Sequence, residues 1–164
     1  MGFGTGHHAT TRLCLAALQT LDVAGKTVLD VGTGSGVLAI AAARLGASEA
    51  HGIDSDADAT RSARENLEAN PEARTVTFET VDVLDATLRQ ADVILANLTG
   101  AALVNAAPLL KAAIAPGGSL ILSGILVHER DDVLAAYAPA DPCWSHEESG
   151  WLAVMFNQTG VRRV

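Results

Sequence analysis

The sequence is poor in cationic residues, and in lysine above all. It has 11 lysine and arginine residues against 19 aspartate and glutamate residues, which gives a net charge of −8, and its only lysines are Lys26 and Lys111. Proteins that bind nucleic acid normally carry a stripe of basic side chains, whereas the only adjacent cationic pair here is Arg162 and Arg163. We therefore expect no direct nucleic-acid binding, and we expect a small molecule or a basic protein as the partner.

Cysteine is also scarce. Cys14 and Cys143 lie far apart and match no CxxC spacing, which is typical of a reducing compartment where thiols simply pack. Residues 1–8 lack the cationic start and the apolar run of a signal peptide. These features favour a cytoplasmic location.

Uncharged stretches of membrane-span length are also scarce, and the longest is residues 93–110. Eighteen uncharged residues approach the length of a membrane span, but Asn97, Thr99, Gly100, Asn105 and Pro108 interrupt the run. We interpret it as a buried strand followed by a broken helix, and we expect no membrane contact.

Adjacent histidines, His7 and His8, raise the question of a metal site. Neighbouring residues in an extended chain point to opposite sides, and no cysteine or carboxylate lies nearby at ligand spacing. We expect no metal.

The 164 residues, of which 49% are hydrophobic, are enough for one domain with a core that needs neither disulfides nor metal. Short apolar runs alternate with segments of helical period. The expected strands are 27–31, 50–53, 75–79, 93–96, 119–122, 143–147 and 151–157. This alternation predicts an α/β fold, with a mostly parallel seven-stranded sheet covered by helices on both faces. The link at 148–150 is so short that the last strand should run antiparallel.

Several local features are predicted along the chain. A helix over 9–21 should be capped by Thr10 or Thr11. Asp56 should cap the helix that follows the strand at 50–53. Pro108 should break a helix over 100–114, and residues 116–118 should form a turn before the strand at 119.

The most informative stretch is residues 28–36, a β-branched strand that runs into a glycine-rich turn. Such turns let the backbone approach a ligand closely, as in dinucleotide-binding folds, but that fingerprint would need glycine at Val37. The spacing is instead D-x-G-x-G-x-G, and an acid at the strand end suits a cationic ligand such as S-adenosylmethionine better than a pyrophosphate. The predicted cofactor-binding residues here are Asp30, Gly32, Thr33, Gly34 and Gly36. A glycine-rich turn in an unrelated α/β protein is the alternative.

Acidic side chains follow the next two strands. Asp54 is placed to accept hydrogen bonds from both ribose hydroxyls of an adenosine; its alternative role, helix capping, is already available to Asp56 and Asp58. Asp82 is placed to address the adenine edge, although it and Asp85 could equally be solvated loop acids.

Asn97 ends the fourth strand, at the edge where open α/β sheets bind ligands. Its side-chain carbonyl could accept from an amine and direct the nitrogen lone pair toward a methyl group. We predict a catalytic and cofactor-binding role for Asn97, with a turn asparagine as the alternative. The glycine-rich segment 2–11 is consistent with a flexible lid over the ligand.

These motifs resemble a known family. Residues 29–36 with Asp54 are similar to the class I S-adenosylmethionine-dependent methyltransferases, which have a Rossmann-like fold. Residues 3–13, 96–98, and 116–118 running on to 123–126 resemble one of their branches, the ribosomal protein L11 methyltransferases (PrmA).

The resemblance implies cofactor contacts from Thr11, Gly32, Asp54 and Asn97, with Phe3, Thr5 and Gly6 folding over S-adenosylmethionine. Family members look like two-domain proteins, whose amino-terminal module grips the ribosomal protein. This chain starts where their catalytic domain starts, so we expect 1–164 to be a single methyltransferase domain without that module.

The implied activity is methyl transfer to the amino groups of a protein, either a lysine side chain or the N-terminal amine. The expected substrate is a basic ribosomal protein of the L11 type or another protein. Two alternatives belong to other classes: a nicotinamide-dependent oxidoreductase, which Val37 disfavours, and a cofactor-binding module without catalysis.

Overall fold

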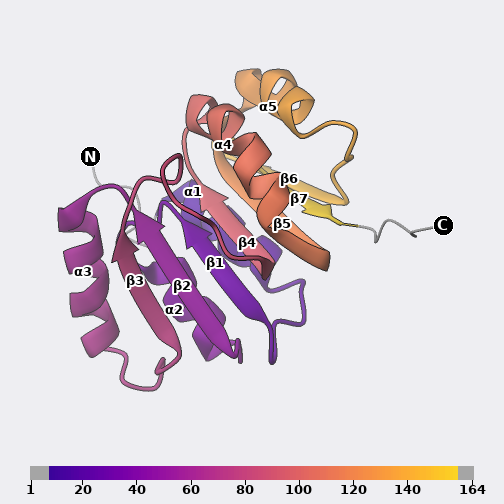
Figure 1. The fold of residues 1–164 in the computed structure, drawn as a ribbon. Helices are drawn as coiled ribbons and strands as arrows, with labels where there is room; N and C mark the ends of the chain where they lie inside the picture. Colours follow the sequence, from indigo (N-terminus) through magenta and orange to yellow (C-terminus); the bar gives the residue numbers. More distant parts are fainter. Residues whose placement is uncertain (1–7, 159–164) are drawn as a thin grey trace.

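The computed structural model describes residues 8–158, which form a seven-stranded sheet with the order β3-β2-β1-β4-β5-β7-β6 (Figure 1). The strands are β1 (Thr27–Val31), β2 (Glu49–Asp54), β3 (Val76–Thr80), β4 (Ala91–Asn97), β5 (Ile114–Leu126), β6 (Trp144–Glu148) and β7 (Trp151–Asn157). The helices are α1 (Ala9–Leu18), α2 (Val37–Arg44), α3 (Ala57–Glu68), α4 (Gly100–Ala113), the 3₁₀ turn η1 (Val127–Glu129) and α5 (Arg130–Tyr137).

The predicted topology is confirmed. Strands β1 to β5 pair in parallel, and β7 lies antiparallel between β5 and β6. Glu148 and Trp151, at the ends of the β6–β7 link, are directly paired. A link of two residues can only reverse the chain, which is why the last strand runs against its neighbours.

Helices cover both faces of the sheet, as expected (Figure 1). On one face, α1 and α2 pack against strand residues such as Val28, Leu95 and Ile121. On the other face, α4 and α5 pack against a second set that includes Ile94 and Leu122. The central strands are therefore buried on both sides and read as unbroken apolar runs.

The prediction that Pro108 breaks its helix is wrong, because α4 continues through it. Proline has no backbone N–H, so Pro108 cannot donate a hydrogen bond to the Val104 carbonyl four residues earlier. Both Pro108 and Val104 lie on the exposed side of α4. Water can therefore satisfy the freed carbonyl without ending the helix.

The turn expected at 116–118 lies inside β5. Ala91 pairs with Ile114 and Val93 pairs with Ser119, so residues 115–118 of β5 bulge opposite Asp92 alone. Gly117 has a φ of 77°, a left-handed conformation that favours glycine. The proline and glycines thus make a bulge in a strand that has already begun.

The start of α1 also differs from the expectation. Its cap is His8, whose side chain accepts a hydrogen bond from the Thr10 backbone, and not Thr10 or Thr11 themselves. Both threonines are completely buried. The helix ends at Leu18, three residues before the predicted end. Asp56 caps α3, as predicted.

The uncharged stretch 93–110 forms most of β4 and the first part of α4. Across residues 8–158, no helix has both the length and the apolar character needed to cross a membrane.

Candidate active site

A cavity of about 750 Å³ opens at the carboxyl ends of the central strands. This volume lies within the usual range for small-molecule sites, roughly 300–1,000 Å³. The predicted site residues that line it are Thr11, Gly32, Thr33, Gly34, Asp54, Asp82 and Asn97. They come from five separate segments, which the parallel sheet brings together at one edge.

The glycine-rich loop forms the floor of this cavity. The backbone N–H groups of Gly32 and Thr33 both donate to the Ile53 carbonyl, at 2.8 and 2.9 Å, which ties the loop to β2. Gly32 has a φ of 71°, and a Cβ atom there would stand 2.3 Å from the Leu98 side chain. The loop therefore needs glycine at this position for its conformation and for its packing.

Asp54 links the loop to the second strand. One carboxylate oxygen accepts from the Gly34 backbone N–H at 2.9 Å, and the other accepts from the Asp56 N–H at 3.0 Å. Asp56 caps α3, because its side-chain carboxylate accepts a hydrogen bond from the Asp58 backbone N–H. Because a carboxylate can accept about four hydrogen bonds, Asp54 retains acceptor capacity toward the cavity that it lines.

Asp30 lies beneath the loop and does not line the cavity. Its side chain is fully buried, with one oxygen accepting from the Thr33 hydroxyl at 2.7 Å and the other without a partner among residues 8–158. Burial raises the pKa of Asp30 to about 6; hydrogen bonds from Thr33 and the Ala39 backbone act against this rise, and the nearby Asp54 charge adds to it. A cation bound close by would favour the ionised form.

Two further buried oxygens lack partners within the described part of the chain, Thr11 Oγ1 and Asn97 Oδ1. Both residues line the cavity. A buried polar atom without a hydrogen bond costs about 1–3 kcal/mol, so both sites favour a ligand that donates hydrogen bonds. Together with Asp54, these acceptors suit a ligand that carries an ammonium group and hydroxyls.

The remaining predicted residues are placed differently. Asp82 lines the cavity, while its carboxylate also accepts from the Leu84 N–H at 2.9 Å. Gly36 does not line the cavity: a Cβ there would meet the Phe78 ring at 2.6 Å and Ala63 at 3.0 Å, so this glycine admits close packing between elements. The predicted lid residues Phe3, Thr5 and Gly6 lie outside the described residues.

The sequence reasoning missed the part of the site that follows Asn97. Leu98, Thr99, Ala102 and Asn105 also line the cavity. Leu98 and Thr99 lie between β4 and α4, and Ala102 and Asn105 lie in the first two turns of α4. Their only signal in the sequence is that they come directly after a strand that ends at the binding edge.

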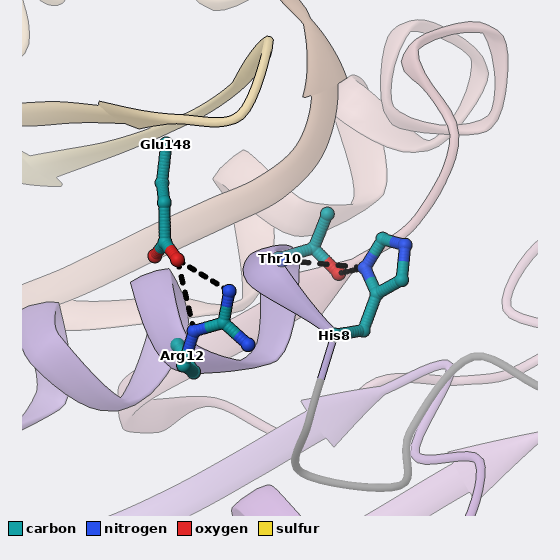
Figure 2. Close-up of polar contacts among 4 residues, drawn as sticks. All are labelled: His8, Thr10, Arg12 and Glu148. Atoms are coloured by element: carbon teal, nitrogen blue, oxygen red, sulfur yellow. Dashed lines mark hydrogen bonds and ion pairs between the residues drawn. The ribbon is translucent and has the colours of Figure 1, made fainter.

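The first turn of α1 forms another wall, and polar contacts hold it in place (Figure 2). His8 Nδ1 lies 2.8 Å from the Thr10 hydroxyl and accepts from the Thr10 N–H at 3.3 Å. Arg12 donates to Glu148 from Nε at 2.9 Å and also from Nη2. The His8 ring contacts Trp151 edge-on, with ring centres 5.4 Å apart. These contacts join α1 to the β6–β7 hairpin.

The sequence of the chain decides its family. Residues 1–159 match the family described as Ribosomal protein L11 methyltransferase (PrmA). Relatives with this same name are 43% identical over 157 residues in Pseudomonas aeruginosa and 45% identical over 157 residues in Cupriavidus metallidurans. The chain belongs to the PrmA family. The resemblance predicted from its motifs is confirmed.

The PrmA relatives are longer than this chain. Both alignments cover 94% of the chain, but the chain spans only about half of each relative, 52% and 50%.

Solved structures agree with the PrmA assignment. The crystal structure of a ribosomal protein L11 methylase from Lactobacillus delbrueckii matches with a TM-score of 0.87 and 28% identity, over 94% of this chain and 81% of that one. An RNA methyltransferase from Salinibacter ruber, solved with S-adenosyl-L-homocysteine, matches with a TM-score of 0.76 and 20% identity, over 96% and 97% of the two chains. The second match supports the Rossmann-like methyltransferase fold alone.

Proposed function

We propose that this PrmA-family chain transfers a methyl group from S-adenosylmethionine to an amino group of a ribosomal protein of the L11 type. The proposal rests on one observation. The glycine-rich loop, Asp54, Thr11 and Asn97 all line one cavity, and the side-chain oxygens of Thr11 and Asn97 have no partner within residues 8–158. The names of the relatives supply the substrate class. A lysine side chain or the N-terminal amine would accept the methyl group.

The residues present fit S-adenosylmethionine. Asp54 would accept from the ribose hydroxyls and Asp82 from the adenine amine, while Gly32 and Gly34 would place the loop beside the ligand in the cavity that they line. Asp30 would place a negative charge beneath the cationic part, and Thr11 Oγ1 would accept from a donor above it. Phe3, Thr5 and Gly6 are proposed to close over the cofactor.

When bound, the cofactor supplies an electrophilic methyl group whose departure leaves a neutral thioether. The protein therefore has little acid catalysis to perform and acts mainly by alignment and by exclusion of water, which are together worth roughly 7–11 kcal/mol when the geometry is well set. Asn97 Oδ1 would accept a hydrogen bond from the acceptor amine and so aim its lone pair. The amine must be neutral to react, because its lone pair forms the new bond.

An oxidoreductase that uses a nicotinamide cofactor finds no support. Its fingerprint requires glycine where Val37 stands, and the family match is to methyltransferases. With ribosomal proteins as the substrate class, the working location we propose is the cytoplasm.

The test uses the full chain, ribosomal protein L11 and S-adenosylmethionine carrying a labelled methyl group. We expect label in the protein at amino groups, and we expect calorimetry to detect binding of S-adenosylmethionine but not of NAD. Asn97→Ala should abolish most of the transfer and retain the fold. Cofactor binding without any transfer to L11 would instead support a binding module without catalysis.

A further inference from the structure

The segment that carries Asn97 is held from behind by the end of β5. The Leu98 N–H donates to the Ser123 carbonyl at 3.1 Å. Gly124 has a φ of 84°, and a Cβ atom there would stand 2.2 Å from the Leu98 carbonyl oxygen and 3.2 Å from Asn97 Oδ1. The β5 backbone therefore lies directly against Asn97 and Leu98, which both line the cavity.

Just beyond β5, the turn η1 brings the Glu129 carboxylate to the same place. Glu129 Oε2 accepts from the Leu126 N–H at 3.0 Å. Its two oxygens lie 2.6 and 3.2 Å from the position that a Gly100 Cβ would take. Gly100 is the buried first residue of α4, so the carboxylate packs onto the amino end of that helix, where negative charge is favourable.

We propose that Glu129 is a positioning residue for Asn97. It accepts a hydrogen bond from the end of β5 and packs against the start of α4. Residues 97–99 therefore lie between the Ser123 and Gly124 backbone on one side and the helix end that Glu129 contacts on the other. Glu129 does not line the cavity, and it therefore acts through the segment and not on a ligand. The inference rests on the proposed function, because it concerns the alignment of the amine acceptor by the Asn97 oxygen.

Three variants test this role. Glu129→Ala removes both the acceptor of the Leu126 N–H and the charge at α4. Glu129→Gln keeps an acceptor and removes the charge. Asp131→Asn is the matched control, since it removes an exposed charge two residues away, whose carboxylate makes no hydrogen bond or ion pair within residues 8–158.

In Glu129→Ala, kcat should fall about tenfold or more, since a misplacement of about 1 Å can lower a rate about 100-fold. The KM and Kd for S-adenosylmethionine should change by a smaller factor than kcat, because Asp54, Thr11 and the glycine-rich loop are left in place. In ¹H–¹⁵N spectra, the Asn97 side-chain amide signals should shift. Glu129→Gln should recover a large part of kcat, and Asp131→Asn should behave like the wild type.

Two results would overturn the inference. The first is a Glu129→Ala protein with wild-type kcat and unmoved Asn97 signals. The second is a parallel loss of kcat, cofactor affinity and Tm, which indicates a general structural role. If the wild type fails to methylate L11, the proposed function fails, but the Asn97 spectra still decide whether Glu129 positions that side chain.

Discussion

The Asp30 side chain is completely buried, and one of its oxygens has no hydrogen-bond partner within residues 8–158. Burial raises its pKa to about 6 from an ordinary value of 3.8. At pH values between these two pKa values, Asp30 is protonated in the folded chain and ionised in the unfolded chain. The free energy of unfolding therefore falls as pH rises through this range. Above pH 6 the ionised carboxylate costs the folded protein about 3 kcal/mol.

Asp30→Asn should therefore stabilise the ligand-free protein at pH 8. We expect a Tm several degrees above the wild type at pH 8, because about 1 kcal/mol corresponds to about 2–4 °C in a domain of this size. At pH 4.5 the gain should largely disappear. The same variant should weaken S-adenosylmethionine binding, because the negative charge beneath the cation is lost. An equal Tm shift at both pH values would rule out titration of Asp30 as the cause.

Asp54 is the residue whose loss should most directly affect the cofactor. Asp54→Ala removes the acceptor of the Gly34 N–H and the proposed ribose contacts, so binding should weaken by about 1.5–3 kcal/mol, the usual scale for hydrogen bonds to a charged group. Calorimetry with S-adenosylmethionine measures this change. The control is Asp58→Ala, which removes an exposed acid of α3 that pairs with Arg61; equal affinities for the two variants would limit Asp54 to a structural role.

Single residues could be predicted where a motif fixes both the residue type and its place on a strand end. Asp54 and Asn97 end β2 and β4, Asp82 follows β3, and all three line the cavity. Contacts made across the fold carry no such local signal: neither Gly124 behind Leu98 nor Glu129 on Gly100 could be found from spacing. Gly36 shares the motif with Gly34, but the need for it lies in the distant Phe78 ring.

At the level of secondary structure, the β6–β7 hairpin and α1 are joined by the Arg12–Glu148 ion pair (Figure 2). The hydrogen bond from Arg12, together with its charge, holds the pKa of Glu148 below the ordinary value. A lowered carboxyl pKa gives stabilisation that is present above the ordinary pKa and is lost as pH falls. Both side chains are exposed, 46% and 36%, so water and salt screen the attraction.

We expect a small thermodynamic effect from this pair. Arg12→Ala and Glu148→Ala should each lower the Tm by no more than about 2–4 °C at neutral pH and low salt. The double variant should resemble either single variant. Thermal unfolding of all four proteins at neutral and acidic pH gives the coupling between them; a coupling that persists in strong salt or at pH 3 would contradict an exposed ion pair.

Element boundaries could be predicted best where periodicity and termination signals agree. The sequence limits of β1 and β7 match the structure, and Asp56 caps α3 as expected. The errors came from residues that fit more than one kind of structure, so that contacts elsewhere in the fold decide which one they adopt. Pro108 stays within α4 because it faces water, and the residues at 116–118 bulge within β5 because Ala91 already pairs with Ile114.

At the scale of the whole molecule, topology followed from a short list of physical rules. Alternating strands and helices require parallel crossovers, and a two-residue link requires a reversal. The face that each helix covers could not be predicted in the same way, because α1, α2 and α4 all bury leucine and alanine side chains. Only contacts across the fold place α1 and α2 in one cluster and α4 and α5 in the other.

The acidic balance of the chain allows a test of the proposed protein substrate. With a net charge of −8, it should attract a basic ribosomal protein over distances that salt controls, since the screening length falls from about 10 Å at 0.1 M to about 3 Å at 1 M. The kcat/KM for L11 should therefore fall as salt rises over this range, while kcat at saturating L11 should stay nearly constant. A short uncharged amine acceptor is the matched control, because its kcat/KM lacks the electrostatic attraction. Salt-independent kcat/KM for L11 would show that this charge plays no part in recognising the substrate.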